Sequence, residues 1–452
     1  MKKFAVSLIV LSLTALLGFV VITTTFRPME SLMRPPKVEG ENLSIQLAFE
    51  EKVGTDYVLK QPVSGNHRNA YNLIDLTGDK NDEVIIFYSK SDNLSIVRMN
   101  VLDNVDGQWK SIADFQSAHS DIQEIEFADL NGDGNKEIVV GWTAFQNSYS
   151  KLMSVYEVSS DNQSARIYPV YGDNYSKFSI IDINCDGKND ILTVKYAKAG
   201  SSVEYIASYL SYEDKNIKEK SSFVLDKSLN SVAAINCDYI KDNTQARIFI
   251  DGYKNDSGML TDCFVWNEAE NKFERYLVKG NTVPSITSRT TTVFCKDIYS
   301  DGSIEIPIED YLPNISDSEN QTNNLGTSLI TWLWIGSEES ELVYSNIILS
   351  QYGYSFIFNR HMLGNVSVEN NPSKNELTFW SIKHNDDIAV KDKKLFSIMT
   401  LTDFDLETIG EISFYYSLIG QSKDKYYFCR IYDGADEFGI NKKEVKDLII
   451  LG

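Results

Sequence analysis

The chain alternates short apolar runs with polar turns over most of its length. In one unit four such runs follow in order: IEFADL from Ile125, EIVVGW from Glu137, KLMSVYEV from Lys151 and ARIYPVY from Ala165. Short runs of this kind, separated by polar turns, predict β-strands. The next unit begins at Phe178, so the pattern predicts an all-β-dominated chain built from four-stranded antiparallel sheets.

Three stretches repeat one pattern of polar positions: DLTGDKNDEVIIF from Asp75, DLNGDGNKEIVVGW from Asp129 and DINCDGKNDILTV from Asp182. Each follows an apolar strand, places oxygen-bearing side chains at positions 1, 3, 5 and 9 of a short loop, and leads into another apolar strand. The first two begin 54 residues apart and the next two 53. This period predicts a β-propeller of five to seven blades, each containing four strands.

Two further units follow at the same rhythm. The stretch SVAAINCDYIKDNTQARIFIDGY has Asn236 at position 1 and lacks the other ligands, so we expect no metal there. The pattern returns in VFCKDIYSDGSIEIPI, where Asp297, Asp301 and Glu305 occupy positions 1, 5 and 9 and Tyr299 occupies position 3. Asp297 lies 115 residues after Asp182, about twice the period, which independently requires the intervening unit.

Beyond Ser350 two interpretations compete. In one, TDFDLETIGEISFYY repeats the loop with Asp403, Asp405, Glu407 and Glu411, and the chain ends in the last blades of a seven-bladed propeller. In the other, Thr402 and Asp405 begin a short helix as a capping box, and residues 351–452 form a small C-terminal α+β module. We prefer the second. In both, INKKEVKDLIIL is a helix with Asn441 as its N-cap.

The N-terminal segment predicts the compartment. Lys2 and Lys3 precede an apolar run over residues 4–22, long enough to cross a bilayer. No small-residue cleavage site follows, so residues 1–24 are predicted to be an uncleaved membrane anchor, with a cleaved signal and secretion as the alternative. The positive-inside rule places the rest outside the cytoplasm, with residues 25–41 as a proline-containing linker before a propeller over residues 42–350.

Two elements are predicted at the start of the propeller. A short helix begins with Asn42 as its cap, ends at Gly54 and packs against the propeller. Its apolar side is predicted to contain Leu43, Ile45, Leu47 and Phe49. The stretch DYVLKQPV, residues 56–63, is an additional strand that we expect to close the ring by joining the last blade.

Charge and cysteine content exclude several classes of protein. Lys and Arg number 43 against 64 Asp and Glu, and a net charge of −21 repels a phosphate backbone, so nucleic acid is not an expected partner. The five cysteines have no CxxC spacing and are odd in number, which argues against both a zinc ribbon and a disulfide scaffold. The four histidines are scattered.

The chemistry of the loops is that of a hard cation. Calcium takes six to eight oxygen ligands, and alternate residues of a tight loop direct their oxygens inward. Position 6 requires a positive φ, which favours glycine; Gly134, Gly187 and Gly302 meet that need, whereas Lys80 strains the first loop. The predicted Ca²⁺ ligands are Asp75, Thr77, Asp79, Glu83, Asp129, Asn131, Asp133, Glu137, Asp182, Asn184, Asp186, Asp190, Asp297, Asp301 and Glu305.

The ligand pattern, the flanking strands and the period together resemble the FG-GAP and VCBS repeat proteins, whose relatives include the propeller of the integrin α-subunit. The resemblance covers residues 56–350. It implies calcium in blade loops at one face. The segment after residue 350 resembles a small module that follows such repeats in extracytoplasmic bacterial proteins.

Two functions are compatible with this sequence. The first is a ligand-binding, adhesion or protein-interaction module with an unknown protein or glycan ligand, in which calcium is structural. The second is an enzyme acting on polysaccharide, of the lyase or glycosidase class. No GxSxG, HExxH, Walker or dinucleotide motif is present, so we favour a protein that is not an enzyme. Trp332 and Trp334 could form a sugar platform, although packing between blades is the more common role of such a pair.

Overall fold

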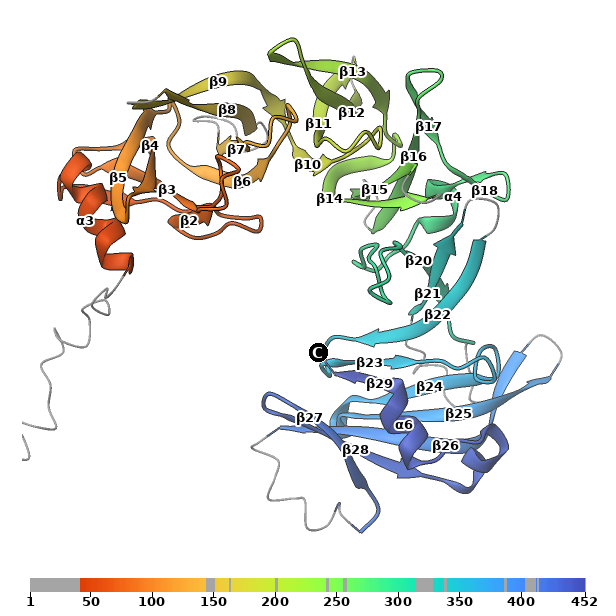
Figure 1. Ribbon diagram of the computed structural model, residues 1–452. Helices are drawn as coiled ribbons and strands as arrows, with labels where there is room; N and C mark the ends of the chain where they lie inside the picture. Colours follow the sequence, from red (N-terminus) through yellow and green to blue (C-terminus); the bar gives the residue numbers. More distant parts are fainter. Residues whose placement is uncertain are drawn as a thin grey trace, which may run out of the picture. The chain divides into compact units, whose positions relative to one another are not determined.

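The protein is mostly β, as predicted, and its sheets are antiparallel and consistent with a β-propeller (Figure 1). The computed structural model describes residues 41–143, 151–161, 164–199, 202–240, 244–254, 258–313, 328–336, 340–385, 388–402, 412 and 414–451. The chain divides into two compact units. Of the described residues, those within 41–63, 67–121 and 158–168 belong to the first unit, and those within 64–66, 122–157 and 169–451 belong to the second.

The first unit contains a five-stranded sheet with an N-terminal helix. The elements are α3 (Glu41–Val53), β1 (Tyr57–Leu59), β2 (Tyr71–Ile74), β3 (Glu83–Lys90), β4 (Asn93–Val105) and β5 (Gln108–Gln116). β1 and β2 both pair with the same edge of β3, one after the other along its length, and β4 and β5 follow on the other edge. The predicted closing of a ring by residues 56–63 is therefore wrong, because this strand pairs within the first sheet.

Helix α3 packs on this sheet, as expected, but with a different face. Ile45, Ala48, Phe49 and Val53 are buried against apolar side chains of β3 and β4. Leu43 and Leu47 are exposed, which corrects the predicted apolar side. The helix begins at Glu41, so Asn42 lies within its first turn, and it ends at Gly54, whose amide donates to the Glu50 carbonyl. The buried spacing of three and four residues is that of one helical face.

Three four-stranded sheets follow along the chain, each with its strands in sequence order. The first contains β6 (Ile122–Ala128), β7 (Glu137–Thr143), β8 (Lys151–Asp161) and β9 (Ser164–Tyr175). The second contains β10 (Lys177–Ile181), β11 (Asp190–Ala199), β12 (Ser202–Glu213) and β13 (Asn216–Val224). The third contains β14 (Leu229–Ile240), β15 (Gln245–Lys254), β16 (Met259–Asn267) and β17 (Lys272–Arg275).

The remaining elements form a hairpin and two five-stranded sheets. The hairpin is β18 (Leu277–Val278) with β19 (Asn281–Thr282), followed by α4 (Val283–Thr287). One sheet has the order β20-β21-β22-β23-β29, with β20 (Ile306–Tyr311), β21 (Ser328–Ile335), β22 (Ser340–Leu349), β23 (Tyr354–Ile357) and β29 (Ile449–Leu451). The other has the order β24-β25-β26-β28-β27, with β24 (Val366–Asn371), β25 (Glu376–Asn385), β26 (Ile388–Thr402), β27 (Ser417–Ser422) and β28 (Lys425–Ile431). Three short helices also lie in this part of the chain: η1 (Pro372–Lys374), η3 (Asp433–Phe438) and α6 (Lys442–Leu448).

Consecutive sheets of the second unit bury their faces against one another. Separate apolar clusters join the β6–β9 sheet to the β10–β13 sheet, that sheet to β14–β17, and β14–β17 to the β20–β21 region. A fourth cluster joins the sheet of β20–β23 and β29 to the sheet of β24–β28. Trp332 lies in β21, is 2 % exposed and donates from Nε1 to Asn346 Oδ1 at 3.0 Å, so it packs inside rather than forming a sugar platform.

The C-terminal segment contains the predicted helix, and it ends in a strand. Asn441 caps α6, its side chain accepting from the amides of Lys443 and Glu444, and β29 then pairs with β23. The predicted division after residue 350 falls between β22 and β23, neighbouring strands of one sheet, and this division stays a prediction.

Several expectations concern residues outside the described part of the chain. The predicted anchor at 1–24, the linker up to residue 40 and the candidate loop at 403–411 all lie there. Among the described residues, no helix has the length and apolarity needed to span a membrane. All five cysteines are described and free, three of them buried.

Candidate functional site

The predicted ligands lie in four loops that stand in corresponding places of four sheets. Loop 1 (75–83) joins β2 to β3, loop 2 (129–137) joins β6 to β7, and loop 3 (182–190) joins β10 to β11. Loop 4 (297–305) precedes β20 and is closed by an isolated bridge between Lys296 and Glu305. In loops 1 to 3 the first carboxylate therefore directly follows an incoming strand and the last begins the outgoing one, whereas in loop 4 Asp297 follows the bridged Lys296 and Glu305 directly precedes β20.

The four loops share one backbone conformation. Positions 4 and 6 have left-handed φ values in every loop, which turns the chain twice within three residues. At position 4 the residues are Gly78 (69°), Gly132 (79°), Cys185 (59°) and Ser300 (56°). At position 6 they are Lys80 (72°), Gly134 (91°), Gly187 (87°) and Gly302 (88°). The positive φ predicted at position 6 is confirmed, and that at position 4 was not foreseen.

Carboxylates at positions 1 and 5 hold this backbone by the same hydrogen bonds in each loop. The position 6 amide donates to Oδ2 of position 1, at 3.0 Å in loop 1, 2.9 Å in loops 2 and 3, and 2.8 Å in loop 4. The position 7 amide donates to Oδ1 of position 5, at 2.8 Å in loops 1 and 2 and 2.9 Å in loops 3 and 4. The bond at position 5 is an Asx turn, in which an aspartate accepts from the backbone two residues on, whereas the bond at position 1 spans five residues and closes the loop.

The carboxylate at position 9 fastens each loop from inside. It accepts from the buried or half-buried position 2 amide, at 2.7, 2.8, 3.1 and 2.9 Å in loops 1 to 4. The four residues are almost fully buried: Glu83 (1 %), Glu137 (2 %), Asp190 (3 %) and Glu305 (1 %). A buried carboxylate needs such donors, because an unpaired one is costly to desolvate.

Position 3 varies between the loops. Thr77 donates from its hydroxyl to Glu83 at 3.2 Å, and Asn131 donates from Nδ2 to Glu137 at 2.9 Å. Asn184 instead donates to Asp186 at 2.9 Å. Tyr299 is 54 % exposed, and its hydroxyl contacts the Val343 carbonyl at 3.4 Å, so its side chain lies away from loop 4.

Burial, with a smaller contribution from nearby acids, raises the pKa of the position 9 carboxyls in loops 2 and 3. For Glu137, burial is the main cause, and the nearby charges of Asp133, Glu157 and Asp129 add to it, against the amide of Leu130; the pKa rises to about 7. Burial likewise raises the pKa of Asp190 to about 6, with a smaller contribution from Asp186. These carboxylates repel one another, and a positive charge placed among them would relieve that repulsion.

Loops 2 and 3, which belong to neighbouring sheets of the second unit, touch one another. Asn189 of loop 3 donates from both its backbone and side-chain nitrogens to the Asp129 carbonyl of loop 2, at 3.4 Å each. The Lys188 side chain lies beside Gly132, where a Cβ would meet its Cε at 2.7 Å. Loops 2 and 3 therefore stand side by side.

The β14–β17 sheet takes the next place, and it contains a buried ion pair instead of an acidic loop. Strand β14 continues through Asn236 to Ile240, without the double turn. Arg247 and Asp238, 2 % and 1 % exposed, form a two-pronged pair with Nε–Oδ1 at 2.7 Å and a second nitrogen at 2.6 Å from Oδ2. Burial opposes the charge of Arg247, but its bonds to Asp238 outweigh burial and raise the pKa of the guanidinium.

This pair also joins the sheet to its neighbour. Asp238 Oδ2 accepts from the amide of Ile304 in loop 4 at 2.9 Å, and Arg247 donates to the Ile335 carbonyl in β21. Sequence reasoning missed both residues, because it compared this unit with the others only at the ligand positions. The signal available was an arginine inside an otherwise apolar strand, ARIFI.

The protein is consistent with the β-propeller class, since four-stranded antiparallel sheets follow one another along the chain, and in the β6–β9 and β10–β13 sheets an acidic loop joins the first two strands. Residues 75–140 match the model of the FG-GAP-like repeat. The matched segment runs from position 1 of loop 1 into β7 and includes loops 1 and 2. A comparison with curated proteins found no match.

Metal-binding geometry is not preformed in the described part of the chain: no three His, Cys, Asp or Glu side chains converge there as a metal site. In each loop the position 1 and position 5 carboxylates are held by amides at positions 6 and 7, whereas the position 9 carboxylate is directed to position 2. One atom differs. Oδ1 of Asp75 is buried and has no hydrogen-bond partner, although Oδ2 of the same group is bonded to the Lys80 amide.

Lys80→Gly is expected to stabilise the first unit by about 0.5–1 kcal/mol, because a side chain in the left-handed region costs roughly 1–2 kcal/mol and glycine regains part of this. Urea unfolding of the two proteins measures the difference. Lys80→Ala is the matched control, since it removes the charge but keeps the Cβ. An equal gain from alanine would show that charge, and not backbone strain, is responsible.

Proposed function

We propose that this protein is an extracytoplasmic calcium-binding module of the β-propeller type, which binds a ligand as an adhesion or protein-interaction module and is not an enzyme. The observation that carries the calcium proposal is the recurrence of one oxygen-lined loop in four sheets, with the same two left-handed residues and the same carboxylate–amide bonds. The same loop conformation in four places favours a common role for these loops.

The donor set fits calcium. Position 1, position 5 and position 9 supply carboxylates in every loop, and position 3 supplies a neutral oxygen in loops 1 to 3. These hard ligands suit calcium, which accepts flexible geometry and backbone oxygens as well. The unpartnered Asp75 Oδ1 gives loop 1 an acceptor whose cost of burial a cation would offset. Bound calcium would supply the positive charge that holds the loop carboxylates together.

An interaction function is supported by the FG-GAP-like match over residues 75–140. The membrane anchor is supported by Lys2, Lys3 and the apolar run at residues 4–22. The proposal that the protein is not an enzyme is supported by the structural use of the loop acids, each of which holds loop backbone. Incubation with polysaccharides and peptides tests this: retention without product is expected, and turnover of any of them would contradict the proposal.

Calcium titration by calorimetry tests the metal proposal. Asp133→Ala is expected to weaken binding at loop 2 by about 10–100-fold, because one charged ligand and its turn are lost. Asp447→Ala is the control, since Asp447 is exposed near the end of α6 and far from any loop in sequence. Equal titrations of Asp133→Ala and the unmodified protein would contradict calcium binding at this loop.

A further inference from the structure

A row of alternating cations and aromatic rings crosses the sheet of β24–β28. In order, its members are Lys391, Trp380, Lys394, Tyr432, Arg430 and Tyr415. The successive distances from charge to ring centroid are 5.2, 5.1, 5.6, 4.8 and 5.0 Å, all within the range of a cation–π interaction. We call this row the cation–aromatic ladder.

The ladder lies on the face of the sheet opposite the apolar core. Neighbouring residues of the same strands, Phe379 and Phe396, are buried in that core, whereas Trp380 and Tyr432 are half-buried and Lys394 is exposed. Strand register places Trp380 opposite Lys394 and Arg430 opposite Ser397. The ladder thus draws on β25, β26 and β28, which fixes its spacing.

Among the residues that the structure describes, two cations of the ladder form no ion pair. Lys391 pairs with Glu369 at 3.0 Å, and the adjacent Lys393 pairs with Glu437. No ion pair joins Lys394 or Arg430 to a carboxylate in the part of the chain that the structure describes. Lys394 and Arg430 therefore place two neighbouring positive charges on one face of this sheet, both against the ring of Tyr432.

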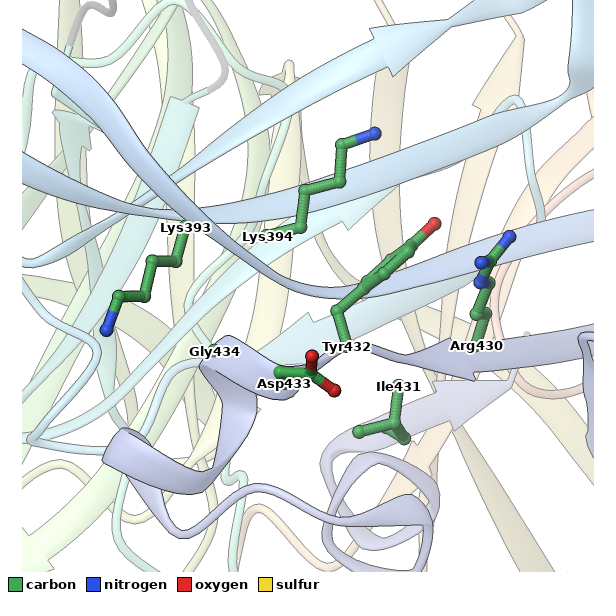
Figure 2. Close-up of a pocket in the computed structure, with 7 residues that line it drawn as sticks. All are labelled: Lys393, Lys394, Arg430, Ile431, Tyr432, Asp433 and Gly434. Carbon is green, nitrogen blue, oxygen red and sulfur yellow. The ribbon is translucent and has the colours of Figure 1, made fainter.

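The two cations border an open cavity of about 460 Å³. It is lined by Lys393, Lys394, Arg430, Ile431, Tyr432, Asp433 and Gly434. Figure 2 shows the Lys394 ammonium, the Tyr432 hydroxyl and the Arg430 guanidinium extending to the same side, whereas the Lys393 side chain and the Asp433 carboxylate extend away from them. The volume is sufficient for a small ligand or for one to two sugar units of a chain.

Exposed rings are found at the Tyr415 end of the ladder. Phe414 is 84 % exposed and Tyr415 is 68 % exposed, the largest values among the large apolar side chains described, and Tyr415 contacts Arg430. Flat rings next to cations suit a pyranose ring, whose C–H face packs on an aromatic surface while its carboxylate pairs with a guanidinium.

We propose that the cation–aromatic ladder binds an acidic saccharide, with Arg430 and Lys394 pairing its carboxylates and Tyr415 packing against a sugar ring. This names the ligand class of the proposed binding function and rests on it. Charge density favours a saccharide over nucleic acid: a sugar chain carries widely spaced charges, whereas duplex DNA carries one charge per about 1.7 Å and would meet the repulsion of the whole acidic protein.

Calorimetric titration of the calcium-loaded full chain with a tetrasaccharide of alternating glucuronate and N-acetylglucosamine tests the proposal. Binding is expected, and it should disappear when the same probe carries methyl esters on its carboxylates. Arg430→Gln and Lys394→Gln are each expected to weaken binding about 10–100-fold, because each removes a charge-assisted hydrogen bond. Lys383→Gln is the matched control, because Lys383 is an exposed lysine of the same sheet that pairs with Asp392 at 2.8 Å and does not line the cavity, and it should change affinity less than threefold.

Three outcomes would overturn the proposal: equal binding of the methyl ester, equal binding by the Arg430→Gln, Lys394→Gln double variant, or tighter binding of a DNA duplex than of the saccharide. Circular dichroism of the variants confirms folding, and all substituted side chains are exposed or half-buried. Calcium binding is titrated separately. Failure of the ladder therefore leaves calcium binding intact, and failure of the loops leaves the saccharide result interpretable.

Discussion

Asp238→Ala is expected to lower the free energy of unfolding by about 3–5 kcal/mol, a large effect for a single substitution. The variant leaves the Arg247 guanidinium buried at 2 % exposure without its partner, and it also removes the acceptor of the Ile304 amide. Chemical denaturation monitored by tryptophan fluorescence measures the loss. Asp238 would for this reason be a poor control for metal binding, since its removal damages the fold itself.

The double variant Asp238→Ala, Arg247→Met distinguishes the cost of an unpaired buried charge from the cost of lost packing. It should be more stable than Asp238→Ala alone by at least about 1 kcal/mol, because replacing both members of a buried pair by apolar groups is often nearly neutral. Equal stabilities of the single and double variants would contradict the role of the pair. So would a single variant that unfolds at the same denaturant concentration as the unmodified protein.

Saturating calcium is expected to raise the melting temperature by on the order of 10 °C. A ligand at one hundred times its dissociation constant stabilises the folded state by about 2.7 kcal/mol per site, so the three loops of the second unit together contribute roughly 8 kcal/mol. Extracellular calcium modules have dissociation constants of about 0.1–1 mM, so about 10 mM calcium approaches this condition. Scanning calorimetry with and without a chelator measures the shift.

Magnesium at the same concentration is the control, because it demands near-octahedral geometry and retains its waters. A smaller shift with magnesium is expected. A melting temperature that is the same in calcium and in chelator would rule out calcium in the loops, and it would leave the four Asx-turned loops as metal-free structural corners.

Local pattern predicted the strands and the loops well, for an identifiable reason. A polar loop ends and a buried strand begins at Glu137, and the same change occurs at Asp190. The change from polar to apolar residues alone locates the end of the loop and the start of the strand. The need for a left-handed residue at position 6 also follows from local sequence, since glycine occurs there in three of the four loops. These features depend on residues within about ten positions of one another.

Features that depend on distant partners were not predictable in the same way. Strand β1 was expected to pair with the last blade, but its pairing with β3 depends on which edge is free. Leu43 and Leu47 are as apolar as Ile45, yet the choice of buried face depends on the sheet that α3 meets. The cation–aromatic ladder combines residues from three strands and a turn, so no single stretch of sequence displays it.

At the contact between the β14–β17 sheet and β21, the positive charge belongs to the Arg247 side chain and not to a bound ion. Chelators, competing ions and dilution therefore do not remove this charge. In a medium poor in divalent ions, loops 2, 3 and 4 would lose any bound cation, while the joint between the β14–β17 sheet and β21 would keep its charge. Loss of stability on ion depletion would therefore begin in the sheets on either side of this contact, and the contact itself would remain.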